Sequence, residues 1–136
     1  RGAAAVEAAL LIPLLVFLLT ACLGGWRVWW AHSQVTAAAS GAARLVSLQH
    51  SPGVARTKAT ALVNADLTTS GVVCAGSSVD VDDAALAKAP GITGEVSVTV
   101  SCQVDLRDLL LPGVPGTITV TSAAVERVDT FRERLS

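Results

Sequence analysis

The chain carries one carboxylate, Glu7, at the edge of a long apolar segment, and this side chain is the first candidate for a functional role. Glu7 follows the stretch RGAAAV, and no charged residue occurs from Ala8 to Trp26. An ionisable residue at membrane depth is by default a functional hypothesis, because a charge is costly in lipid. A peptidase cutting after Gly2 would make Ala3 the new N-terminus, and its ammonium could pair with Glu7 within one chain or between neighbours. The alternative places Glu7 in the headgroup region beside Arg1.

The apolar segment behind Glu7 is long enough to cross a membrane. It contains 19 consecutive uncharged residues, and roughly 18–20 apolar residues span a bilayer core as a helix. The whole chain of 136 residues is 51% apolar and 15% charged, with a mean hydropathy of +0.57, whereas soluble domains average about 25% charged residues. We therefore expect a membrane helix followed by one modest domain. A buried helix of a soluble protein is the alternative.

Two further features mark this helix. Pro13 removes one helical hydrogen bond, which predicts a kinked or locally melted helix. A cluster at the far end of the run has the spacing that places three tryptophans on one helical face, typical of a membrane–water interface; a soluble aromatic core is the alternative. The predicted interface residues are Trp26, Arg27, Trp29 and Trp30. Arg1, on the other side of the run, suits a cytoplasmic N-terminus.

The N-terminal stretch RGAAAVEAALLIPLL combines a basic-Gly start, small residues, Val-Glu and an apolar helix with an early proline. The residues that carry this pattern are Arg1, Gly2, Ala3, Val6, Glu7 and Pro13. In this pattern the segment resembles TadE-like proteins, the minor pseudopilins of tight-adherence (Tad, type IVc) pili. The resemblance implies a processing site between Gly2 and Ala3 and a role for Glu7 in assembly or processing. Because Arg1 is present, either the precursor is seen or this member is not cut after Gly2.

The resemblance also implies how the protein works. It implies a non-enzymatic subunit that initiates, primes or caps pilus assembly. The implied location is the cell membrane, with the N-terminus in the cytoplasm and the C-terminal domain outside, or the extracellular pilus. The implied partners are other pilin subunits, a prepilin peptidase, the inner-membrane assembly platform and membrane lipid. No cofactor, metal, small-molecule substrate or nucleic acid is expected. The net charge of −1 gives no basic surface that would bind nucleic acid.

Two other interpretations of the same segment remain open. Leu19-Thr20-Ala21-Cys22 fits a lipobox, which would make the chain an envelope lipoprotein lipidated at Cys22. Glu7 lies where a secretory signal is normally basic, and Leu23 to Trp30 is apolar where a polar tether is expected. The second interpretation is a single-pass structural envelope protein outside any pilus. We favour the pilus subunit.

The sequence predicts an α+β fold with a boundary after residue 31, so that residues 1–31 form the processing segment and membrane helix. Residues 32–136 should then form a pilin-like domain with an extension of the first helix, one further helix and a short antiparallel sheet. The expected segments are helices over Ser33–Gln49 and Val54–Leu67 and strands over Val79–Asp82, Val96–Leu106 and Thr117–Thr121, with a continuation of the last strand to Val128 left open. Between the last two strands, Leu109–Leu111 should pack under the sheet or contact a partner chain.

Cys74 and Cys102 both follow the membrane segment, in the part expected to face an oxidising compartment. We predict a disulfide between them; two separate buried thiols are the alternative. No catalytic set of residues emerges. We expect His32 and His50 to be polar residues at helix ends. The run that includes Asp80, Asp82 and Asp83 lacks the spacing of a calcium loop, and we expect it to form a solvated strand edge.

Overall fold

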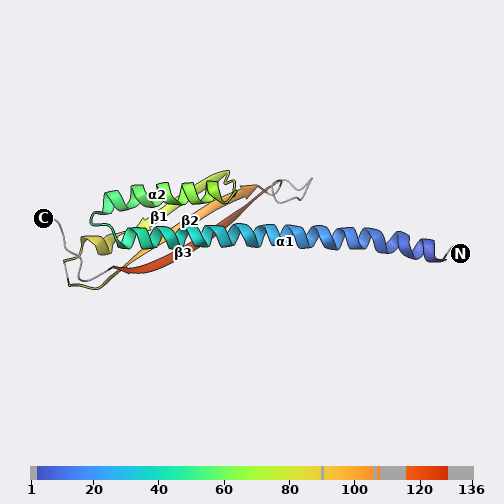
Figure 1. The fold of residues 1–136 in the computed structure, drawn as a ribbon, viewed down its shortest axis with the longest axis horizontal. Helices are drawn as coiled ribbons and strands as arrows, with labels where there is room; N and C mark the ends of the chain where they lie inside the picture. Colours follow the sequence, from blue (N-terminus) through green and yellow to red (C-terminus); the bar gives the residue numbers. More distant parts are fainter. Residues whose placement is uncertain (1–2, 90, 106, 108–115, 129–136) are drawn as a thin grey trace.

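The computed structural model describes residues 3–89, 91–105, 107 and 116–128. It has the predicted α+β architecture, built on one long helix (Figure 1). The elements follow in the order α1 (Ala3–Ser47), α2 (Pro52–Thr69), β1 (Gly76–Asp82), a short 3-10 helix η1 (Ala84–Ala87), β2 (Gly94–Asp105) and β3 (Thr117–Val128). The N-terminal part of α1 projects as a rod beyond the rest of the molecule, and the other elements gather along its C-terminal part.

The helix α1 is unbroken over 45 residues. Alanine and leucine, which favour helices, make up much of it. The hydroxyls of Thr20, Thr36 and Ser40 donate to backbone carbonyls four residues earlier, so these side chains are satisfied without leaving the helix. The predicted extension of the first helix beyond the apolar run is confirmed. The boundary expected after residue 31 therefore lies inside one helix.

The second helix returns along the first. It begins at Pro52, and proline is well suited to a first helical position because the N–H that it lacks would have no partner there. It is two residues longer at each end than predicted. The buried positions on α2 are Ala55, Ala59, Val63 and Leu67, whereas Asp66, next to this face, is exposed. The buried face of α2 is the one that packs on α1, and the carboxylate of Asp66 is exposed to solvent.

Three antiparallel strands in the order β1-β2-β3 form the sheet. The alternation predicted for the central strand is confirmed, since every second residue of β2 is buried on one face: Val96, Val98, Val100, Cys102 and Val104. This face lies against the helices, with α1 over β2 and β3 and α2 next to α1 (Figure 1). The opposite face is polar, and on it the hydroxyls of Ser101 and Thr121 lie 3.0 Å apart in a hydrogen bond.

Small side chains let the helices approach one another closely. The buried alanines of α1 are Ala31, Ala38, Ala39, Ala42 and Ala43, and those of α2 are Ala55 and Ala59. The larger buried side chains of the two helices include Val35, Val46 and Val63. Gly94 shows how tight the distal end is, because an added Cβ would lie 2.6 Å from the Cβ of Ala85. The predicted packing of Leu109–Leu111 falls outside the described residues.

Candidate functional site

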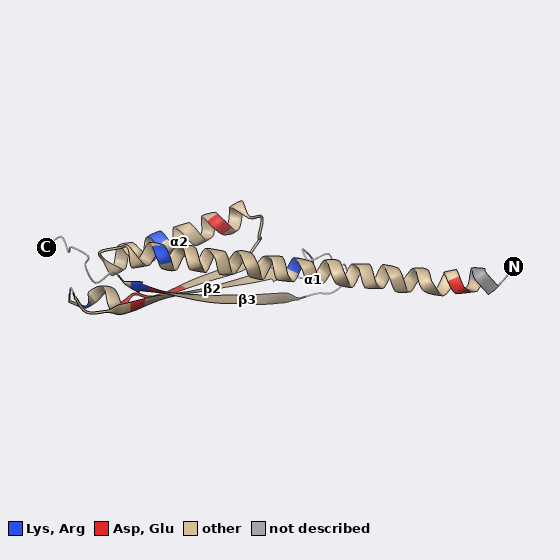
Figure 2. Ribbon diagram, turned by 60° about the horizontal axis from the view of Figure 1, so that its bottom comes forward, with Lys and Arg blue, Asp and Glu red and all other residues tan. Residues whose placement is uncertain are grey.

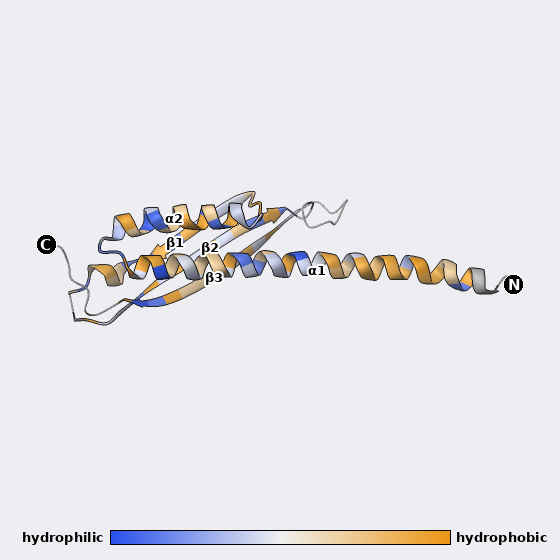
Figure 3. Cartoon of the chain, viewed as in Figure 1, coloured by the Kyte–Doolittle hydropathy of each residue, from blue (hydrophilic) through white to orange (hydrophobic). Residues whose placement is uncertain are grey.

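The N-terminal half of α1 exposes an apolar surface that no other described element covers. From Val6 to Leu23 the large side chains are exposed, including Leu10, Phe17 and Leu19. Figure 3 shows this hydrophobic stretch on the part of α1 that leaves the domain. Within the part of the chain that the structure describes, one helix, over Val6–Ser47, is long and apolar enough to cross a membrane. A large exposed apolar surface is typical of a membrane or protein interaction site.

Glu7 lies exposed near the beginning of this rod. Figure 2 shows an uncharged stretch of α1 between that acidic position and the next basic one, which is Arg27 in the sequence. Among the described side chains, Glu7 has no ion-pair partner. Arg1 and Gly2, which precede the predicted cleavage site, lie outside the described residues. Ala3 is described only as the first residue of the helical backbone. The processing site and the role of Glu7 therefore stay predictions.

Pro13 lies inside α1 without interrupting it. The local melting that the sequence suggested is wrong, because the backbone stays helical on both sides of the ring. The reason is that proline removes a single N–H bond from a helix of 45 residues, and the flanking turns keep theirs. Gly24 and Gly25 likewise continue the helix. A kink in the helix axis at Pro13 stays a prediction.

The predicted tryptophan cluster divides into two parts. The rings of Trp26 and Trp29 lie 5.6 Å apart between centroids, and both are well exposed. Trp30 is less exposed, at 42%, and it lines a shallow pocket of about 240 Å³ together with Arg27. The other side of the pocket is formed by Val72, Val73 and Val104, among others. The sequence placed these tryptophans on one helical face but could not indicate that Trp30 meets the domain.

Cys74 and Cys102 form the predicted disulfide, with their Cα atoms 5.4 Å apart. Cys102 is fully buried in β2, and Cys74 is partly buried in the segment between α2 and β1. The bridge thus ties the segment that follows α2 to the central strand. Cys22, the cysteine of the lipobox interpretation, is free and exposed within the unbroken helix α1.

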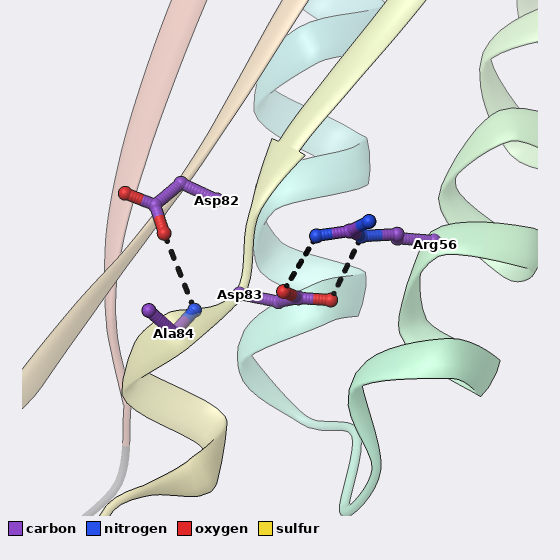
Figure 4. Close-up of polar contacts among 4 residues, drawn as sticks. All are labelled: Arg56, Asp82, Asp83 and Ala84. Carbon is purple, nitrogen blue, oxygen red and sulfur yellow. Dashed lines mark hydrogen bonds and ion pairs between the residues drawn. The ribbon is translucent and has the colours of Figure 1, made fainter.

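Sequence reasoning missed one ion pair. Asp83 is 8% exposed at its side chain and accepts two hydrogen bonds of 3.1 Å from Arg56 on α2, through Nε and Nη2 (Figure 4). The prediction of a solvated strand edge is therefore wrong for Asp83, because the chain turns inward there toward α2. It is correct for Asp80 and Asp82, which are exposed; Asp82 accepts a bond from the backbone N–H of Ala84.

The remaining candidates show no assembled chemistry. His32 and His50 are both exposed, His32 on α1 and His50 just beyond its C-terminal end. Across residues 3–89, 91–105, 107 and 116–128, no group of three or more His, Cys, Asp or Glu side chains is placed to hold a metal ion.

Comparison with known proteins agrees with this geometry. Residues 2–44 match the family described as TadE-like protein, a range that takes in Glu7, Pro13, the tryptophan cluster and most of α1 but not α2 or the sheet. Searches of curated proteins and of solved structures gave no match. The resemblance noted from the N-terminal residues is confirmed, and it extends over residues 2–44, which are similar to the TadE-like family.

Proposed function

We propose that this chain is a minor pilin or pseudopilin of a Tad-type pilus. In this proposal the N-terminal half of α1 anchors the subunit in the cytoplasmic membrane before assembly, with the N-terminus in the cytoplasm and the domain outside. The observation that carries the proposal is where the family match falls. It covers the projecting apolar rod and its continuation along the domain, which are the parts that a filament would build from.

The exposed rod suits both environments that such a subunit must occupy. In the membrane, lipid chains cover its large apolar side chains, and in a filament the helices of neighbouring subunits take the place of the lipid. The exchange leaves the same side chains buried, so it needs no refolding of the domain. A structural subunit of this kind initiates, primes or caps a filament, and we assign it no catalytic role.

The charged end of the rod supports the expected processing. A prepilin peptidase that cuts after Gly2 would leave an ammonium on Ala3, one helical turn from Glu7. In the low-dielectric interior of a helix bundle, this ammonium and the Glu7 carboxylate of the same or a neighbouring subunit would pair and set the register of the helices. The partners in this scheme are other pilin subunits, the peptidase, the inner-membrane assembly platform and membrane lipid.

The test is the substitution Glu7→Ala in the native host, with Glu126→Ala as the matched control. Glu126 is an exposed glutamate on β3, far from the rod in sequence. Removing one partner of a buried charge pair costs about 2–5 kcal/mol, so incorporation into pili or pilus number should fall by more than about tenfold. Pili are counted by electron microscopy and the subunit by immunoblot of sheared filaments.

N-terminal sequencing of the membrane-extracted protein accompanies this measurement. Ala3 as the first residue supports processing after Gly2. Unchanged pili together with unchanged processing in Glu7→Ala would show that the assigned role of Glu7 is wrong. If intact-mass measurement found a diacylglycerol adduct on Cys22, the chain would be a lipoprotein and the proposal of a pilus subunit would be wrong. Normal pili after deletion of the gene would favour a single-pass structural protein.

A further inference from the structure

The domain touches α1 at the level of the tryptophan cluster. The turn after α2, residues 71–73, and Val104 near the end of β2 line one pocket with Arg27, Trp30 and Ala31 of α1. Figure 1 shows α2 and β2 both ending on the side of the domain from which the rod projects. This membrane-facing end of the domain, formed by residues 71–73 and Val104, therefore has a defined position along the α1 axis.

That position can be compared with the dimensions of a bilayer. From Ala8 to Trp26 the helix advances about 28 Å at 1.5 Å per residue, close to the hydrocarbon thickness of about 30 Å. The next five residues, Arg27 to Ala31, advance about 7 Å, which matches one headgroup layer. A helix that crosses the membrane over the apolar run thus holds the membrane-facing end of the domain at headgroup depth.

The side chains at this end suit such a layer. Val72 is buried, whereas its neighbour Val73 is 67% exposed and adds an apolar side chain to the surface of this end. Two arginines lie at the same end: Arg27 lines the pocket, and Arg107 is exposed two residues after β2. The backbone N–H of Arg107 donates a hydrogen bond of 2.9 Å to Asp105.

We propose that the membrane-facing end of the domain rests in the phospholipid headgroup layer of the membrane that α1 crosses. Val73 contacts lipid within this layer, and the exposed guanidinium group of Arg107 faces lipid phosphates. The occupant is lipid because this surface continues directly from the apolar rod at the depth where tryptophan and arginine favour the interface. The subunit then has two membrane contacts, the helix and the turn, which together limit the tilt of the domain against the bilayer.

The proposal rests on the membrane anchoring included in the proposed function, and the experiment separates the two. The full chain is reconstituted in vesicles of phosphatidylethanolamine and phosphatidylglycerol with the photoreactive residue p-benzoylphenylalanine replacing Val73. The matched control has the same residue in place of Val54, another exposed valine at the opposite end of α2. A third variant carries it in place of Leu15, in the middle of the rod. After irradiation, mass spectrometry measures lipid adducts at each position, and an intact Cys74–Cys102 bridge shows that each variant is folded.

The expected result is a lipid adduct at position 73 severalfold above that at position 54, and a strong adduct at position 15. Adducts at position 15 with no excess at position 73 overturn this inference and leave the membrane anchor in place. No lipid adduct at position 15 overturns both. In native membranes, protein adducts in place of lipid adducts at position 73 would show that a protein partner occupies this end, which also overturns the proposal.

Discussion

The substitution Cys74→Ser removes the disulfide with little other disturbance. Cys74 is partly buried beside Asn64, Thr68 and Ser77, a polar setting in which a serine hydroxyl can be hydrated. Its partner Cys102 keeps its thiol, which behaves as a small apolar group in the buried face of β2. The measured change therefore reports mainly on the lost cross-link.

The magnitude follows from the loop that the bridge closes. The two cysteines are 28 residues apart, and the chain-entropy relation for a loop of this length predicts a loss of roughly 3.5 kcal/mol in the free energy of unfolding. For a domain of this size, 1 kcal/mol corresponds to about 4–8 °C in Tm, so Tm should fall by roughly 15–25 °C. The assay is thermal unfolding of the full chain in detergent, followed by circular dichroism under non-reducing conditions.

Two controls define the result. Reduction of the parent protein should lower Tm to nearly the same value as Cys74→Ser. The same exchange at the free cysteine, Cys22→Ser, should leave Tm unchanged, because Cys22 lies in the rod and closes no loop. A Cys74→Ser protein whose stability stays within about 1 kcal/mol of the parent's would refute the reasoning, since it would mean that the loop is already ordered without the bridge.

Two further substitutions test the packing of α2. Arg56→Ala leaves the buried carboxylate of Asp83 without its partner and should reduce the free energy of unfolding by about 1–2 kcal/mol, because the exposed guanidinium is partly screened; Lys58→Ala, on the same helix and exposed, should cost less than about 0.5 kcal/mol in the same urea titration. Ala59→Leu forces a larger side chain between the helices and should destabilise by about 1–3 kcal/mol, whereas Ala61→Leu, on the exposed face of α2, should leave the urea midpoint unchanged. Equal effects for Ala59→Leu and Ala61→Leu would contradict the helix packing described above.

Much of the fold could be predicted because the signals are local. The uncharged run predicts the membrane-capable rod from composition alone, and the alternation from Val96 to Val104 predicts both the central strand and its buried face. The position of Cys102 on that face follows from the same period of two. The disulfide prediction added one further premise, an oxidising compartment, and the structure bears out the pairing.

Other features could not be predicted because they depend on distant partners. Asp83 follows Asp80 and Asp82 in a run that looks uniformly solvated, but it is buried because α2 brings Arg56 against it. Asp66 lies next to the buried face of α2 in the helical period, yet it is exposed, and Leu67 is the residue that packs inward. No spacing rule encodes either outcome, since each depends on where another element comes to lie.

The sequence by itself determined the helix that is long and apolar enough to cross a membrane, the TadE-like N-terminal pattern and the order of helices and strands, because hydropathy and side-chain period act over a few neighbouring residues. Only the tertiary structure decided which side chains meet across the chain. It brings Val73 to the level of Trp30, and it pairs the buried carboxylate of Asp83 with Arg56. It also packs the buried alanines of α2 against α1. The physical reason is that these contacts depend on the register and tilt of packed elements, which result from the balance of packing over the whole core.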